Sequence, residues 1–285
     1  TGKIGEQMDI EKIQQSITEL VERATEVAEN FALAILTTDL VPKTVSEVVQ
    51  LSTGDVRITG ICKGSGMIHP NMATMLGYLL TDAKMTTQMA QTLVKESADA
   101  SFNMISVDGD SSTNDCVFLM ASGESHVEIK SDADYLAFKE ALFEVSKVLA
   151  QSIAADGEGA NKLIEVELVG APSLELARSA ARGVTMSPLI KTAMHGEDPN
   201  WGRILARLGA DKVQAACLEK MSLLIQGEAL FENGAPILFD RVFVKNLLKQ
   251  PKIQITIDLK SGTETATAWG CDLSKKYVDI NTEYT

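Results

Sequence analysis

Hydrophobic residues recur at helical spacing near the start of the chain. Between Met8 and Leu36 they repeat about every 3.6 residues, which is typical of one or two amphipathic helices. Asp9 stands where an N-cap is expected. Thr37-Thr38-Asp39 interrupts the pattern, and Pro42 prevents a helix from continuing past it. The apolar stripe consists of Ile10, Ile13, Ile17, Leu20, Val21, Ala24 and Val27.

Alternating and continuous apolar segments predict strands along the rest of the chain, and longer periodic segments predict helices. The predicted strands are 44–49, 56–62, 75–81, 116–121, 163–169, 222–231, 253–259, 263–269 and 277–280. The predicted helices are 86–101, 132–155, 173–184 and 242–248. Turns are expected at 52–55 and at Asn233-Gly234, a glycine stop follows Ala155, and Ser173 is placed to cap a helix.

The order of these elements indicates the fold class. Helices and strands mix without a regular β-α-β alternation, and neither Gly-x-Gly-x-x-Gly nor a P-loop motif occurs. Their absence weighs against a dinucleotide-binding or P-loop fold. The sequence predicts a mixed α/β (α+β) fold in which helices lie on the faces of sheets.

Charge and cysteine usage narrow the classes of function. The net charge of −13 argues against nucleic acid or an anionic membrane as a partner. No apolar run is as long as a membrane span, and the first residues do not resemble a signal peptide. The four cysteines are scattered and form no C-x-x-C pair, which is typical of reduced thiols in a cytoplasmic protein.

One segment carries unusual chemistry, Lys63-Gly-Ser-Gly-Met-Ile-His-Pro-Asn-Met-Ala-Thr-Met-Leu. Its glycines and Pro-Asn pair predict an irregular loop that leads Ala73-Thr74 into a strand. An N-terminal threonine can act as a nucleophile because its own α-amine serves as the base. A cut between Ala73 and Thr74 would create one. From these residues alone, an ordinary junction between loop and strand is favoured.

Other polar clusters are better explained without a metal. His69, His126 and His195 lack metal-ligand spacing, so no metal site is expected. His69 could act as a base near Thr74, but an α-amine makes that role unnecessary. The run from Asp108 to Asp115 resembles a calcium loop in composition but lacks the closing glutamate. It predicts a turn with Asx hydrogen bonds, lining the site.

Nine segments, in order along almost the whole chain, resemble the ornithine acetyltransferase family, which contains the bifunctional glutamate N-acetyltransferases of arginine biosynthesis. The resemblance implies that family's aminopeptidase-like fold. Each segment is weak by itself, and their order makes coincidence a poor explanation. The segments begin at Thr1, Thr37, Lys63, Phe102, Asp156, Ser187, Gly196, Ala266 and Tyr277.

The resemblance implies an acetyl transfer in two steps. Thr74, freed by self-cleavage after Ala73, would take the acetyl group of N-acetylornithine and pass it to glutamate. The Thr1 hydroxyl and the Gly2 backbone N–H would stabilise the oxyanion. Glu197 is a second choice for an acidic contact, and Thr38 is an alternative to Thr37. The implied substrate-binding residues are Thr37, Lys63, Thr74, Glu158, Asn281 and Thr285.

The resemblance also implies how the chain is divided and assembled. Residues 1–73 correspond to the C-terminal part of an α portion, which has a further N-terminal segment in the family, and residues 74–285 to a β portion. Two of each would form a heterotetramer. No cofactor is expected, and acetyl-CoA as a co-substrate stays open. The alternatives are a threonine amidohydrolase or aminopeptidase, an uncleaved binding subunit, and Thr1 itself as the nucleophile.

Overall fold

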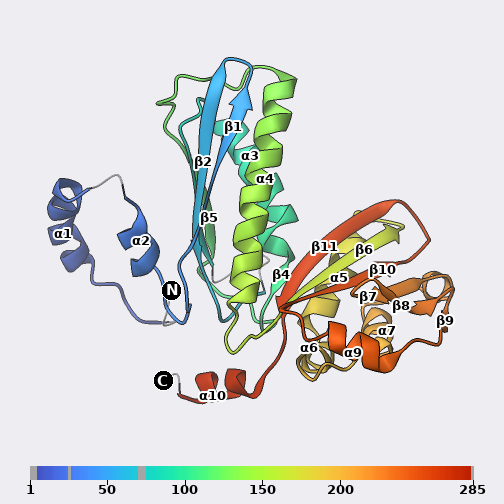
Figure 1. The fold of residues 1–285 in the computed structure, drawn as a ribbon. Helices are drawn as coiled ribbons and strands as arrows, with labels where there is room; N and C mark the ends of the chain where they lie inside the picture. The colour runs from blue at the N-terminus through green and yellow to red at the C-terminus, as the bar shows by residue number, and fades with distance from the viewer. Residues whose placement is uncertain (1–4, 25–26, 70–74, 284–285) are drawn as a thin grey trace.

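Two mixed sheets with helices on their faces make up the protein (Figure 1). The computed structural model describes residues 5–24, 27–69 and 75–283. The first sheet is long and upright in this view, and the second lies beside its lower end. This arrangement confirms the mixed α/β fold that the sequence predicts.

The first sheet has the strand order β1-β2-β3-β5. β1 pairs antiparallel with β2, β2 antiparallel with β3, and β3 parallel with β5. Two helices, α3 and α4, pack against one face. α4 comes very close at Gly60, where a Cβ atom would lie 2.6 Å from Leu149 Cδ1. The bounds are β1 Lys43–Leu51, β2 Gly54–Lys63, β3 Leu76–Thr81, β5 Cys116–Ala121, α3 Thr87–Ala100 and α4 Asp132–Ala155.

The second sheet has the order β4-β11-β6-β10-β7-β8-β9. α5 packs on β6 and β11, and α7 packs on α5. The strands are β4 Ile105–Ser106, β6 Leu163–Ala171, β7 Ser222–Ile225, β8 Glu228–Glu232, β9 Ala235–Pro236, β10 Lys252–Asp258 and β11 Glu264–Cys271. The helices are α5 Leu174–Met186, α6 Pro188–His195, α7 Trp201–Ala210, α8 Ala215–Leu218 and α9 Arg241–Leu247, and a short 3-10 helix, η1 Phe102–Met104, precedes β4.

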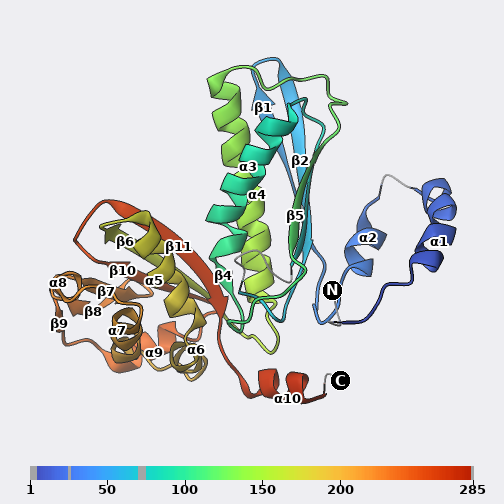
Figure 2. The same ribbon diagram turned by 180° about the vertical axis from the view of Figure 1, so that it is seen from behind.

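The N-terminal periodic region forms two helices, α1 (Ile10–Glu22) and α2 (Glu29–Ala34), as predicted. The Asp9 carboxylate accepts a hydrogen bond from Lys12 N at 2.9 Å, which confirms the expected N-cap. α2 lies on the face of the first sheet opposite α4, where the Phe31 ring meets Tyr78 edge-on at 4.9 Å. α1 stands apart from the sheets and buries no residue (Figure 2). Its apolar stripe is therefore exposed.

Several predicted bounds are confirmed, and two predictions are wrong. β5 and α4 have the predicted limits, and Ser173 caps α5 by accepting from Leu176 N. The predicted strand 222–231 is instead a hairpin, because Gln226 and Gly227 both adopt positive φ. The predicted strand 277–280 lies within the helix α10 (Lys275–Glu283).

α10 is held against the turn that follows α4. The Ser274 hydroxyl donates to the Gly159 carbonyl at 2.6 Å. Gly159 has φ +72°, and a Cβ atom there would lie 2.5 Å from Tyr277 N. Only glycine therefore allows the start of α10 to come so close to the turn after α4. Within the described residues, the structure has no helix with both the length and the apolar character needed to cross a membrane.

Candidate active site

The predicted site residues divide into two groups. Thr37, Lys63, Glu158 and Asn281 lie within the described part of the structure, on four separate segments. The other predicted site residues, Thr1, Gly2, Ala73, Thr74 and Thr285, lie outside the described residues. The geometry of the site is therefore built from the first group and its neighbours.

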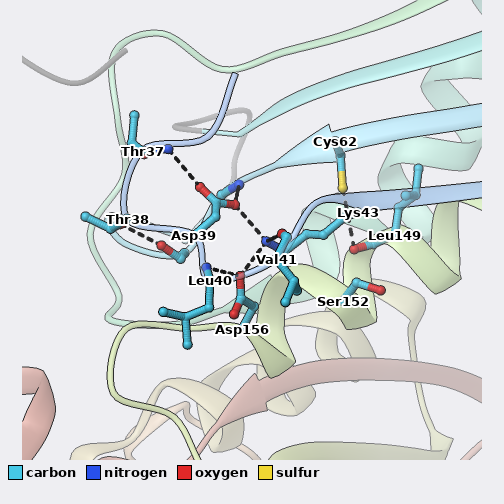
Figure 3. A network of polar contacts seen from close by, with 12 residues as sticks. Thr37, Thr38, Asp39, Leu40, Val41, Lys43, Cys62, Leu149, Ser152 and Asp156 are labelled. Atoms are coloured by element: carbon cyan, nitrogen blue, oxygen red, sulfur yellow. Dashed lines mark hydrogen bonds and ion pairs between the residues drawn. The ribbon is translucent and has the colours of Figure 1, made fainter. Parts of the chain in front are cut away.

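A buried lysine, Lys43, joins two of these segments, those of Thr37 and Glu158 (Figure 3). Its Nζ donates to Asp39 Oδ1 at 2.7 Å, to Asp156 Oδ2 at 2.6 Å and to the Val41 carbonyl at 3.2 Å. The side chains of Lys43 and Asp39 are 1% and 0% exposed. Asp156 is the C-cap residue of α4 and lies two residues before Glu158. We call Asp39, Lys43 and Asp156 the lysine hub.

The lysine hub fixes the loop that contains Thr37. Asp39 accepts backbone N–H bonds from Thr37 at 3.3 Å and from Gly64 at 2.6 Å. Burial by itself would raise the pKa of Asp39, but the bonds from Lys43 and Gly64 and the charge of Lys43 outweigh it. The pKa of Asp39 is therefore lowered, and its carboxylate stays charged.

Thr37 and Thr38 are placed differently. Thr38 Oγ1 lies 2.6 Å from Ser65 Oγ, so this hydroxyl already has a partner in the loop after β2. The Thr37 side chain is exposed. Of the two threonines, Thr37 therefore has the hydroxyl that is better placed to meet a ligand.

Glu158 and Asn281 meet beside the same loop. The Asn281 amide donates to Glu158 Oε2 at 2.8 Å, although the two residues are 123 positions apart. Glu158 N donates to the Ser65 carbonyl at 3.0 Å. A Cβ atom on Gly66 would overlap the Glu158 carboxylate, so a larger residue there would push that carboxylate out of its position. Glu158 is thus fixed against the 63–66 loop and is more constrained than an exposed helix-end residue.

Lys63 is buried rather than solvated at the surface. It is the last residue of β2, pairs with Leu76 of β3, and is 2% exposed. Burial lowers the pKa of Lys63, while the negative charges of Asp39 and Asp115 oppose that shift. A buried cation is expensive to maintain, so its position next to two carboxylates indicates a functional site.

The Asp108 turn holds the middle of the 63–69 loop. Its carboxylate accepts from Met67 N at 2.6 Å and from Ile68 N at 3.0 Å. It also accepts from Asp110 N at 3.1 Å, which confirms the predicted Asx bond. Burial raises the pKa of Asp108, and these bonds oppose the shift. The turn therefore lines the loop that leads toward Thr74.

His69 is poorly placed to act as a base. Its Nδ1 lies 3.1 Å from Ser106 Oγ, and its Nε2 lies 3.0 Å from Arg182 Nη2. Burial and the charge of Arg182 lower the pKa of His69 to about 4, so the ring is neutral. With Nε2 accepting from the arginine, neither nitrogen has a lone pair to offer a substrate.

Glu197, the second choice for an acidic contact, gains no support from the geometry. Glu197 follows α6, and no hydrogen bond or ion pair among the described residues joins it to Thr37, Lys63 or Glu158. In the same part of the chain, no group of three or more His, Cys, Asp or Glu side chains is arranged to hold a metal.

Sequence reasoning missed the lysine hub and Asp115. Lys43 begins an alternating strand, where a lysine is normally exposed, and its partner Asp156 is 113 residues away. Asp115 ends the Asp108–Asp115 run directly before β5, which was the only sequence signal for it. Burial raises the pKa of Asp115 to about 7, against the opposing effects of the Met75 amide and Lys63.

Comparison with known proteins gives the same assignment as the motifs. The ArgJ family model matches residues 1–285. "Arginine biosynthesis bifunctional protein ArgJ" of Lactococcus lactis is 46% identical over 287 residues, covering 100% of this chain and 72% of the relative. The protein of that name from Thermotoga neapolitana is 44% identical over 290 residues, covering 100% and 73%.

A solved structure matches as well. The crystal structure of "Arginine biosynthesis bifunctional protein argJ" from Bacillus halodurans has a TM-score of 0.71 and 38% identity. The match covers 73% of this chain and 99% of that one. The fold and these relatives define a class of bifunctional arginine-biosynthesis proteins. The chain belongs to the ArgJ family, which confirms the resemblance seen in its motifs.

Proposed function

We propose that this chain moves the acetyl group of N-acetylornithine to glutamate through an ester on Thr74. One observation carries the proposal. Thr37, Lys63, Glu158 and Asn281 come from distant parts of the sequence, and the lysine hub and the Glu158–Asn281 bond draw their segments around one loop. These are the positions at which the family motifs imply substrate contacts.

The charges of the site suit an amino acid substrate. Lys63 supplies a buried cation for the α-carboxylate that N-acetylornithine and glutamate share. Glu158 supplies an anion, held by Asn281, for the side-chain ammonium of ornithine. A cation and an anion at opposite ends of one substrate fix its orientation, which brings the acetyl group to a defined place.

The transfer needs a nucleophile and its base. We assign both to Thr74, whose hydroxyl attacks the acetyl carbonyl while its α-amine takes the proton. Ornithine then leaves with that proton, and the acetyl group stays on Thr74 Oγ. The amine of glutamate attacks the ester in the second step and restores the hydroxyl. We assign oxyanion stabilisation to Thr1 Oγ and Gly2 N–H, as the family motifs imply.

Self-cleavage between Ala73 and Thr74 is part of the proposal. The position falls between β2 and β3, which are paired neighbours in the first sheet. Residues 74–285 are 212 of the 285 residues, about three quarters of the chain. The solved Bacillus halodurans chain is covered over 99% of its length by 73% of this chain, which is the size expected of a separate β portion.

Three further assignments belong to this proposal. We propose that acetyl-CoA serves as a second acetyl donor, because the relatives are named bifunctional. We propose a heterotetramer of two α and two β portions, as the family resemblance implies. We propose a cytoplasmic location, which the four unpaired cysteine thiols favour.

Intact-mass measurement of the purified chain, with and without N-acetylornithine, tests the function directly. We expect two fragments that meet at Ala73–Thr74, with one acetyl group added to the fragment that begins at Thr74. Added glutamate should remove that group as N-acetylglutamate. Loss of the group to water alone would indicate a hydrolase, and an uncut, unmodified chain would indicate a binding subunit.

A further inference from the structure

Asp115 lies beside the start of β3, directly before β5. β3 and β5 run parallel from the pair Leu76 and Cys116. Cys116 N donates to the Met75 carbonyl at 3.1 Å, which sets Asp115 next to Met75. Met75 is the residue that directly follows Thr74 in the sequence, so Asp115 lies next to the described end of the segment that carries the cleavage position.

Among the described residues, the carboxyl group of Asp115 makes no hydrogen bond of good geometry, although the Met75 amide and the Lys63 ammonium lie near enough to act on its charge. Both of its oxygens are buried. Leaving a buried carboxyl unsatisfied costs stability, so a fold seldom retains one without a use. Asp115 also lines a cavity of about 310 Å³ between α3 and the starts of β3 and β5.

The surroundings of Asp115 favour both protonation states near neutral pH. Burial raises the pKa of Asp115 to about 7, and the Met75 amide and the Lys63 ammonium reverse only part of the shift. Across the cavity, α3 presents Lys95 and Asp99, which form their own ion pair at 2.5 Å. A carboxyl group with a pKa near the working pH transfers protons most effectively.

We propose that Asp115 is the acid–base residue of the chain cleavage between Ala73 and Thr74. The geometry that points to it is a buried carboxyl group with two unpartnered oxygens beside Met75, at the edge of a cavity. The inference rests on the cleavage in the proposed function and adds the residue that moves its protons.

The proton transfers balance as follows. The Thr74 hydroxyl oxygen bonds to the Ala73 carbonyl carbon and gives its proton to one Asp115 oxygen. The other oxygen of the neutral carboxyl group gives its proton to the Thr74 nitrogen as the Ala73–Thr74 peptide bond breaks. Water then hydrolyses the ester, which restores the hydroxyl. The carboxylic acid formed at Ala73 gives its proton to the new amine.

Neighbouring groups are already occupied. Asp39 accepts from Lys43 and from two backbone amides, and Asp108 accepts from three backbone amides. His69 is neutral, and its Nε2 accepts from Arg182. Of Asp39, Asp108 and Asp115, only Asp115 has both oxygens available to exchange protons.

The test follows cleavage of the full chain by intact mass, over time and across about pH 5.5 to 8.5. Asp115→Asn keeps the shape of the side chain and cannot exchange a proton, and we expect cleavage about 100-fold slower. Cleavage of the unsubstituted chain should slow as pH rises through 7, and Asp115→Asn should lose this dependence. Asp110→Asn, an exposed acid in the same loop, is the matched control and should cut normally.

Chemical rescue separates proton transfer from a structural effect. In Asp115→Ala, added formate should restore cleavage by occupying the vacated space, and chloride at equal ionic strength should not. Asp115→Asn that cuts at the unsubstituted rate with the same pH profile overturns this inference alone. An unsubstituted chain that never cuts, or Thr74→Ala that still does, overturns the proposed cleavage and this inference together.

Discussion

Replacing Lys43 by methionine tests whether the lysine hub holds the site together. The substitution keeps most of the side-chain volume and removes the ammonium group. Asp39 and Asp156 then lose their shared cation while their side chains are 0% and 8% exposed. Removing one partner of a buried ion pair costs about 3–5 kcal/mol, because the remaining charge is left buried.

This loss of stability is large enough to measure by thermal or urea denaturation. Each kcal/mol lowers Tm by about 2–4 °C in a chain of this size, so Lys43→Met should melt about 6–20 °C lower. The matched control is Lys95→Met, which breaks the exposed pair with Asp99 on α3. Because exposed pairs contribute about 1 kcal/mol or less, that change should lower Tm only slightly.

The pH dependence gives a second, independent measurement. The pKa of Asp39 is lowered in the folded protein, so its contribution to stability is present above its ordinary value of 3.8 and is lost as pH falls through the lower one. In Lys43→Met the Asp39 carboxylate can relieve its burial by taking up a proton. The gap in unfolding free energy between the two proteins should therefore shrink from about pH 7 to about pH 4. A cost equal to that of Lys95→Met at every pH would refute the reasoning.

Three further substitutions test the substrate contacts. Lys63→Met should raise KM for both amino acid substrates at least about tenfold, because a charged hydrogen bond to the carboxylate is lost, and an unchanged KM would remove Lys63 from the site. Glu158→Gln should raise KM for N-acetylornithine more than for glutamate in steady-state assays, and equal effects would contradict a contact with the ornithine ammonium. Gly66→Ala should displace Glu158 and abolish most activity, whereas Gly209→Ala, where a Cβ atom meets open space, should leave activity intact.

Sequence patterns correctly predicted the helices and strands whose formation depends mainly on their own residues. α4 and α5 contain periodic apolar residues, and α5 begins at the predicted Ser173 cap, while Ser131 caps α4. The region 277–280 was predicted incorrectly because its apolar residues alternate as in a strand. Its helix is stabilised by contacts with Gly159, more than a hundred residues earlier. α6, α7 and α8 were not predicted at all.

Only those residues of the candidate site that lie in family motifs were predicted from the sequence. Those motifs indicated Lys63 and Glu158, and the structure adds the bonds that fix Glu158 and the burial of Lys63. The burial and the charged surroundings of Lys43 and Asp115 depend on residues that the first sheet and α4 bring together. A single sequence contains no local pattern for such contacts, because a buried charge is defined by what surrounds it.

The pairing of β2 with β3 has a consequence for how the two portions are made. β2 precedes position 74 and β3 follows it, and the ion pair between Lys43 and Asp156 also crosses that position. A cut there would separate two polypeptides that are already folded against each other. Each α portion would therefore be in contact with one β portion from the moment of cleavage. Equal amounts of the two portions would then require neither separate regulation of two genes nor diffusional association of free subunits.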